Sequence, residues 1–197
     1  MQHLTSLRRT AAVAAAVAAL PFLAGPAEAA SRAVDDAQGD MWKVEEGGTN
    51  PTATPGASLG DFLRTKYTHT DSRVIVKAKF VDLAPVGKRF TVWVEMRNQD
   101  HRKWFAGLEA TPKNRAGEGF LMTNRGKDLA CDVRLRIDYD RNTVRAGFPR
   151  SCLDNPRWLQ FSTLSEQVRR SWKYAWLDNA QTKAIDSRVW STKVRHG

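Results

Sequence analysis

The chain has 197 residues, of which 42% are apolar and 26% charged, a composition typical of a folded domain rather than a disordered chain. Its 31 lysines and arginines exceed its 21 acids and give a net charge of +10, while 2 cysteines are too few for a disulfide-rich scaffold or a four-thiolate zinc site. With 4 histidines in all, one of them in the predicted leader, a three-histidine metal centre is not expected.

Residues 1–29 have the three parts of a secretion signal. Arg8 and Arg9 form a basic start, residues 11–25 form an apolar run, and Ala27-Glu28-Ala29 is a small-residue cleavage site. Prolines and a glycine interrupt the run before it reaches the roughly 20 apolar residues of a membrane span. We therefore predict a secreted, extracellular protein with no membrane span after cleavage. Its mature charge is +9, because cleavage removes two arginines and one glutamate (29 cations minus 20 acids).

The remaining chain is predicted to form one domain. Residues 30–60 are an N-terminal segment with an acidic turn, a short strand near residues 41–44 and a loop. From Asp61 apolar residues alternate, as in half-buried strands. Many short strands separated by turn residues predict an all-β fold, an antiparallel, jelly-roll-like sandwich over residues 61–197. Residues 30–60 are expected to belong to the same domain. The expected strands are 74–80, 90–96, 104–109, 119–123, 132–139, 143–148, 158–162 and 188–194.

A hairpin around Arg141 and Asn142 predicts a disulfide. If these two residues form a two-residue turn, the residue numbers of each facing pair add up to 283. Cys131 and Cys152 have this sum, so they would face each other. Such a pair would be non-hydrogen-bonded, the kind in which the two backbones come closest, and this closeness suits a disulfide. The same register sets Asp138 opposite Arg145 and places the apolar residues of both strands on one face. We predict a structural Cys131–Cys152 bridge.

The segment after residue 162 allows two interpretations. The sequence Thr163-Leu-Ser-Glu166 has capping-box spacing, and apolar residues recur every four positions, which indicates a short helix. Residues 171–176 alternate instead, which indicates extended chain. The structure of residues 163–180 therefore stays open.

An acidic run between residues 35 and 40 is the nearest approach to a metal-binding motif. Asp35, Asp36 and Asp40 surround Gly39, and their carboxylates could bind Ca²⁺ as a structural ion. The spacing is not that of an EF-hand, and a plain surface turn is the alternative. No other cofactor is expected.

A basic face is the second candidate site. A two-residue turn at Asp71 and Ser72 would place Lys66 opposite Lys77 and Arg64 opposite Lys79 on the outer face. Like charges in register cost a few tenths of a kcal/mol or more, so the arrangement is either tolerated in solvent or binds an anion. The candidate partners are an extracellular glycan or an anionic wall polymer; nucleic acid is not expected, and nothing indicates the oligomeric state.

Tryptophans suggest a carbohydrate platform. Of the 7 tryptophans, Trp172 and Trp176 alternate with Tyr174, and the three rings would share one side of an extended segment. Trp93 is placed on the outer side of its own strand. Core packing is the alternative for each ring.

Two common catalytic signatures are missing from the sequence. It contains no H-E-x-x-H and no glycine-rich phosphate loop, and His69 falls on a predicted core face. We therefore predict a non-enzyme, an exported β-sandwich that binds carbohydrate or an anionic envelope polymer. The alternatives are a glycan-active hydrolase, which would need two converging carboxylates, and a structural or protein-interaction module.

Two stretches resemble known proteins. The order Asp36-x-x-Gly39-Asp40, then Asp61-Phe-Leu-Arg-Thr-Lys-Tyr-Thr-His-Thr, then Asp71 to Leu83 resembles the opening of DOMON-like and family 9 carbohydrate-binding-like β-sandwiches over about 50 residues. The later sequences Val144 to Leu153 and Pro156 to Leu159 resemble uncharacterised exported proteins of actinobacteria. The first resemblance implies a jelly-roll sandwich and a ligand role toward sugars or haem, but no Met and His pair fits haem ligation.

Overall fold

The structure is a computed structural model that describes residues 30–45, 50–185 and 188–197. The predicted secretion signal, residues 1–29, lies outside the described residues. The described part contains strands and a 3-10 helix, η1 (Arg150–Leu153), but no α-helix. The strands are β1 (Ala30–Asp35), β2 (Trp42–Glu45), β3 (Thr52–Ala53), β4 (Phe62–His69), β5 (Arg73–Phe80), β6 (Arg89–Asn98), β7 (Lys103–Thr111), β8 (Asn114–Thr123), β9 (Arg134–Asp138), β10 (Thr143–Pro149), β11 (Trp158–Val168), β12 (Tyr174–Asn179) and β13 (Val194–Arg195).

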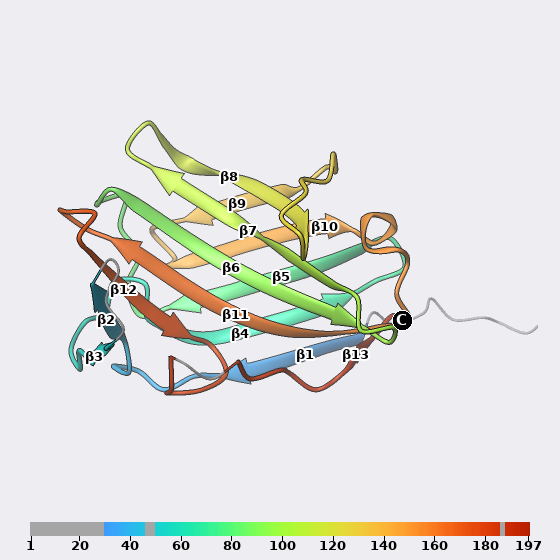
Figure 1. The fold of residues 1–197 in the computed structure, drawn as a ribbon, viewed down its shortest axis with the longest axis horizontal. Coiled ribbons are helices and arrows are strands. Elements are labelled where there is room, and N and C mark those ends of the chain that lie inside the picture. The colour runs from blue at the N-terminus through green and yellow to red at the C-terminus, as the bar shows by residue number, and fades with distance from the viewer. Residues whose placement is uncertain (1–29, 46–49, 186–187) are drawn as a thin grey trace, which may run out of the picture.

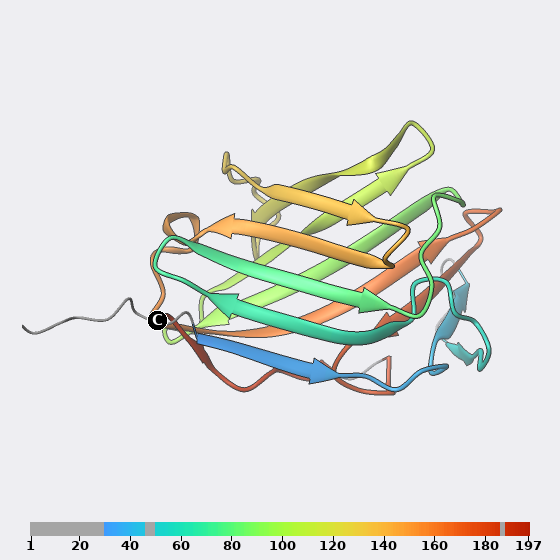
Figure 2. The same ribbon diagram turned by 180° about the vertical axis from the view of Figure 1, so that it is seen from behind.

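The strands form two stacked antiparallel sheets (Figures 1 and 2). The smaller has 5 strands in the order β1-β4-β5-β10-β9. The larger has 8, in the order β3-β2-β12-β11-β6-β7-β8 with β13 beside β11. The predicted antiparallel β-sandwich is confirmed. Within the described residues, no helix is long and apolar enough to cross a membrane.

The core lies between the sheets and is rich in aromatic rings. Tyr67 of the smaller sheet stacks on Phe161 of the larger sheet, with ring centroids 4.4 Å apart. Phe80 and Phe90 also meet across the layers, in an edge-to-face contact with ring centroids 5.7 Å apart. His69 is completely buried, and its Nδ1 lies 3.2 Å from the carbonyl oxygen of Val194, so the prediction of a core histidine is confirmed.

The N-terminal segment contributes to both sheets. β1 pairs with β4 in the smaller sheet, and β2 pairs with β12 in the larger one. Residues 36–41 therefore cross from one sheet to the other, and we call them the acidic crossover. The crossover is short, and its side chains lie where the ends of the two sheets meet.

The β4–β5 hairpin has the predicted register over most of its length. Lys66 faces Lys77 and Arg64 faces Lys79, as a turn at residues 71–72 requires. The two-residue turn would also place Leu63 on the inner face opposite Phe80, and this expectation is wrong. A bulge shifts the register between residues 62 and 64, so Phe62 faces Phe80 instead. Phe62 is completely buried, whereas Leu63 is half-buried.

The β9–β10 hairpin has a longer turn than predicted. Thr143 faces Asp138 and Val144 faces Ile137, so the numbers of paired residues sum to 281 rather than 283. Arg145 therefore faces Arg136, and the predicted pairing of Asp138 with Arg145 is wrong. Asp138 instead accepts a hydrogen bond from the Arg141 backbone N–H at 3.0 Å and stabilises the longer turn. A shift of two leaves every side chain on its predicted face, because the side-chain period of a strand is two.

The predicted Cys131–Cys152 disulfide is present. The two Cα atoms are 6.4 Å apart. Cys131 lies in the connection from β8 to β9, and Cys152 lies in η1 rather than in the strand that precedes it. The bond therefore joins a connection between the sheets to the end of the β9–β10 hairpin, and not two facing strand positions as expected.

Two other assignments need correction. The helix considered after residue 162 is wrong, because β11 continues as a strand to Val168, with alternate side chains buried. Its long pairing with β6 overrides the local capping-box pattern. The strand expected at 188–194 is also wrong for most of its length, since only Val194 and Arg195 are paired with β11.

Candidate functional site

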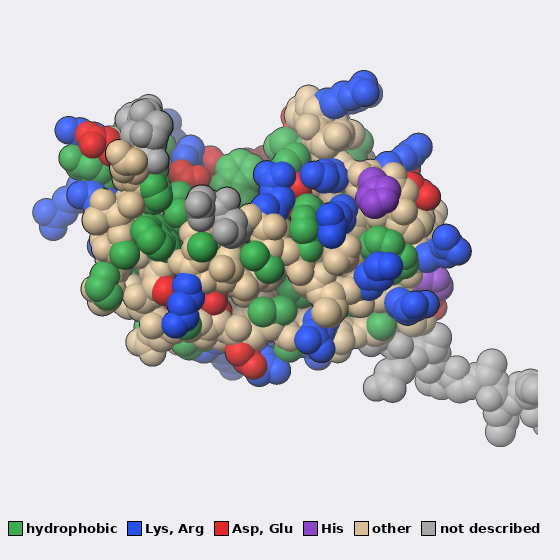
Figure 3. Space-filling model, turned by 60° about the horizontal axis from the view of Figure 1, so that its bottom comes forward, with side chains coloured by type: hydrophobic (Ala, Val, Ile, Leu, Met, Phe, Trp, Pro, Cys, Tyr) green, Lys and Arg blue, Asp and Glu red, His purple; other side chains and the backbone are tan. Residues whose placement is uncertain are grey.

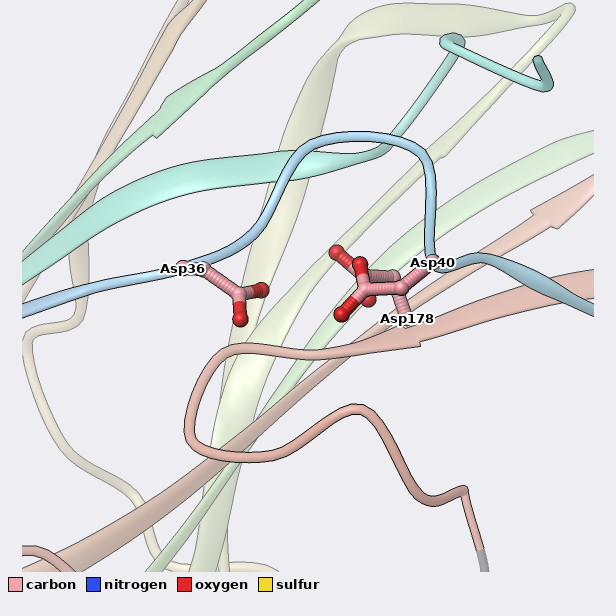
Figure 4. A group of neighbouring side chains, drawn as sticks. All are labelled: Asp36, Asp40 and Asp178. Carbon is pink, nitrogen blue, oxygen red and sulfur yellow. The ribbon is translucent and has the colours of Figure 1, made fainter. Parts of the chain in front are cut away.

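Four aspartates from three parts of the chain meet at the acidic crossover. Asp36 and Asp40 lie on the crossover itself, Asp61 immediately precedes β4, and Asp178 lies on β12. Figure 4 shows the side chain of Asp36 pointing toward the carboxylates of Asp40 and Asp178. Each of these three residues offers an oxygen, and the three oxygens lie within 4.8 Å of one another.

Backbone donors hold two of the carboxylates in place. Asp61 Oδ2 accepts a hydrogen bond from the Gly39 N–H at 2.8 Å, where Gly39 adopts a φ of +84° that favours glycine. Asp178 Oδ2 accepts one from the Phe62 N–H at 2.6 Å. These two bonds orient the Asp61 and Asp178 side chains toward the crossover without any ligand.

Several carboxylate oxygens in this cluster have no donor. Asp36 Oδ2, both oxygens of Asp40 and Asp61 Oδ1 are buried without a hydrogen-bond partner. Asp61 is 0% exposed and Asp178 is 1% exposed. Among the described residues, no lysine or arginine forms an ion pair with any of the four. A buried carboxylate without a donor or counter-charge costs several kcal/mol unless it is neutralised.

The buried environment changes how these carboxyls titrate. Burial raises the pKa of Asp178 to about 8, of Asp36 to about 7 and of Asp61 to about 6, and repulsion from neighbouring carboxylates adds to each increase. Burial also raises the pKa of Asp40, although the positive charge of Lys183 opposes that increase. At neutral pH the cluster must therefore hold protons or bind a cation.

The donor set fits a hard divalent cation. Ca²⁺ binds carboxylate oxygens at about 2.3–2.6 Å, so two ligands of one ion are at most about 5 Å apart. The 4.8 Å spread of the Asp36, Asp40 and Asp178 oxygens meets this limit. No soft ligand lies in the cluster, since it contains neither cysteine nor histidine. The arrangement can bind calcium between the crossover and the two sheets.

The sequence prediction of this site was partly wrong. Asp35 points away from the cluster, is exposed, and forms an ion pair with Arg64 at 2.7 Å. Adjacent residues of an extended chain face opposite sides, so Asp35 and Asp36 cannot both point inward. Asp61 and Asp178 take part instead; no local pattern marks them, because the topology brings them to the crossover.

The predicted ligand-binding residues do not form one site. Lys66 and Lys77 lie on the outer face of the smaller sheet, whereas Trp93 lies on the outer face of the larger sheet. Since these are opposite sides of the sandwich, Trp93 and the basic face belong to separate surfaces.

The expected aromatic platform is also divided. Tyr174 and Trp176 lie on one face of β12, with Lys43 Nζ 3.8 Å from the Tyr174 ring centroid. Trp172, which is 54% exposed, instead packs near Arg89, whose guanidinium is 5.3 Å from its ring centroid. Arg89 faces outward from the larger sheet, so the three rings do not present a continuous stacking surface.

A pocket of 340 Å³ lies on the outer face of the larger sheet. It contains Glu95, which is 7% exposed and forms ion pairs with Arg188 at 2.8 Å and Lys103 at 3.6 Å. Trp93 donates its Nε1–H to Glu166 at 3.2 Å, which fixes its ring in the pocket wall. The other described lining residues are Phe105, Ser162, Leu164, Asn179 and Ile185.

Comparison with known proteins gives no match for this chain among protein-family models, curated proteins or solved structures. The resemblance to DOMON-like and family 9 carbohydrate-binding-like sandwiches stays a prediction.

Proposed function

We propose that this protein is an exported, non-catalytic β-sandwich that binds one calcium ion at the acidic crossover. The ion would bind Asp36 and Asp40 of the crossover together with Asp178 of the larger sheet. Asp61 would complete the negative charge around it. Binding would hold the crossover against the sandwich.

The proposal rests on the group of buried carboxylate oxygens that have no hydrogen-bond donor and no ion pair with a described residue. One cation among Asp36, Asp40 and Asp178 would neutralise several of these charges at once, whereas protonation neutralises the carboxyls one at a time. Export, predicted from residues 1–29, would deliver the chain to an environment where calcium is abundant.

Accessibility supports a non-catalytic role for the cluster. Asp61 and Asp178 expose 0% and 1% of their surface, so a polymeric substrate has no contact with their carboxylates, while an ion is small enough to reach them.

The test is a calcium titration of the mature protein at pH 8, after treatment with EDTA, followed by thermal unfolding. We expect calcium to raise the melting temperature, because it binds the folded state preferentially. Asp40→Asn should abolish most of this increase and, without calcium, should unfold at or above the wild-type temperature because it removes repulsion.

The matched control is Asp35→Asn, which removes the same charge from the same run but outside the cluster. It should respond to calcium as the wild type does. A wild-type protein whose melting temperature does not change in millimolar calcium would overturn the proposal, as would an equal response of Asp40→Asn.

A second function, carbohydrate binding, is favoured by the pocket at Trp93. Aromatic rings stack on sugar faces, and Trp93 and Phe105 both line this pocket. On an array of neutral and acidic oligosaccharides, Trp93→Ala should lose binding and Trp172→Ala should retain it. Equal binding by both variants, or none by the wild type, would refute this role.

A further inference from the structure

The outer face of the smaller sheet carries a row of positive charge that crosses four strands. Lys66 of β4 faces Lys77 of β5, Lys77 also faces Arg145 of β10, and Arg145 faces Arg136 of β9. Since neighbouring strands are about 4.8 Å apart, the row spans about 14 Å. We call these four residues the basic row.

The centre of the basic row has no neutralising partner. Arg136 forms an ion pair with Asp138 at 3.4 Å. In contrast, Lys66, Lys77 and Arg145 are exposed and form no ion pair with any described residue. Facing like charges are destabilising, so this face retains an arrangement that lowers stability slightly.

The adjacent row on the same face shows a different arrangement. There, Asp35, Arg64, Lys79, Thr143 and Asp138 follow one another across the same sheet. Acids occupy both ends of that row, and Arg64 pairs with Asp35 at 2.7 Å. The sheet therefore accommodates acids beside its cations, and the basic row contains none.

We infer that the basic row binds an anionic glycopolymer, one that carries a phosphate or carboxylate group on its repeating units and lies across β4, β5, β10 and β9. Side chains that reach about 14 Å in a line match a linear polyanion better than a single compact anion. This inference is independent of the calcium site, which lies between the sheets and not on this outer face.

The composition of the face disfavours single-stranded nucleic acid. The outward positions beside the basic row are Thr68, Ile75, Gly147 and Arg134 on one side and Arg64, Lys79, Thr143 and Asp138 on the other, and none of them is aromatic. Single-stranded nucleic acid is usually bound by stacking its bases on aromatic rings, and this face offers none. Recognition there would depend on charge.

The experiment compares two variants with the same loss of charge. The first is Lys66→Gln, Lys77→Gln and Arg145→Gln. Cations also gather on another side of the molecule (Figure 3), so binding could reflect net charge alone. The control therefore removes three exposed charges outside the basic row: Lys113→Gln, Arg125→Gln and Lys127→Gln, near β8. Binding to polygalacturonate and to polyphosphate is measured against salt concentration in EDTA, so that calcium cannot bridge polymer and protein.

We expect the basic-row variant to bind the polymers more weakly. The slope of log K against log salt concentration should decrease in magnitude by about three, because three cations are lost. The control should change much less, and thermal unfolding should show both variants folded. Preference for one polymer would distinguish carboxylate from phosphate as the bound group. Equal weakening of both variants, no binding by the wild type, or tighter binding of duplex DNA through the same residues would overturn the inference.

Discussion

Two of the connections between the sheets are held in different ways. The connection from β8 to β9 contains Cys131, and a covalent bond joins it to Cys152 of η1. The acidic crossover from β1 to β2 has no such bond, and its buried side chains repel one another. The disulfide does not titrate, whereas the charge of the buried aspartates at the crossover changes with pH. Sensitivity to solution conditions should therefore concentrate at the acidic crossover.

The disulfide should give the largest effect. Its loop spans a sequence separation of 21 residues, so replacing both cysteines by serine should lower the free energy of unfolding by roughly 3 kcal/mol on the chain-entropy model. Urea unfolding with and without calcium measures this change. The calcium response should persist in the double variant, since its ligands lie elsewhere; its loss would mean that the two connections are not independent.

Acid pH should stabilise the calcium-free protein. The folded-state pKa values of Asp36, Asp61 and Asp178 lie above the ordinary value of 3.8, at about 7, 6 and 8. The folded state therefore binds more protons than the unfolded state between pH 4 and 8, and stability decreases as pH rises through this window.

This pH dependence can be measured by thermal unfolding in EDTA at pH 5 and pH 8. We expect a melting temperature at least about 3 °C lower at pH 8, corresponding to about 1 kcal/mol for a chain of this size. Saturating calcium should raise the pH 8 value the most, because its ligands bind as carboxylates. A melting temperature that rises from pH 5 to pH 8 in EDTA would contradict the assigned pKa shifts.

The basic row should give the smallest effect. Its cations are exposed, so water and salt screen their repulsion, unlike that of the buried aspartates. Lys77→Glu would place an acid between Lys66 and Arg145 and should stabilise the protein by a few tenths of a kcal/mol at low salt. Urea unfolding at low and high salt should show that this gain disappears as salt increases. A gain above about 1 kcal/mol would show that the row is less well solvated than its exposure indicates.

The sequence predicted local pairings better than the contents of the site. At the β4–β5 hairpin, alternation and a two-residue turn determine the register, and the facing of Lys66 with Lys77 follows directly. At the β9–β10 hairpin the turn length was wrong, yet the faces were right, because a shift of two preserves the side-chain direction.

The candidate metal site was only half predictable. Asp36 and Asp40 are close in sequence and could be recognised as a pair. Asp178 lies on a strand whose position depends on pairing with β2 and β11, and Asp61 is oriented by the backbone of Gly39. The capping-box pattern near residue 163 indicated a helix, which is wrong for the same reason: the conformation there is determined by long-range pairing with β6 and not by the local sequence.

The separation of the aspartates along the chain has a consequence for folding kinetics. Asp36 and Asp178 are 142 residues apart (178 minus 36), so their oxygens meet only after β2 and β12 have paired. An ion that needs this late contact stabilises the native state but not the transition state that precedes it. Calcium should accordingly slow unfolding and leave the rate of refolding nearly unchanged, extending the lifetime of the finished molecule rather than hastening its formation.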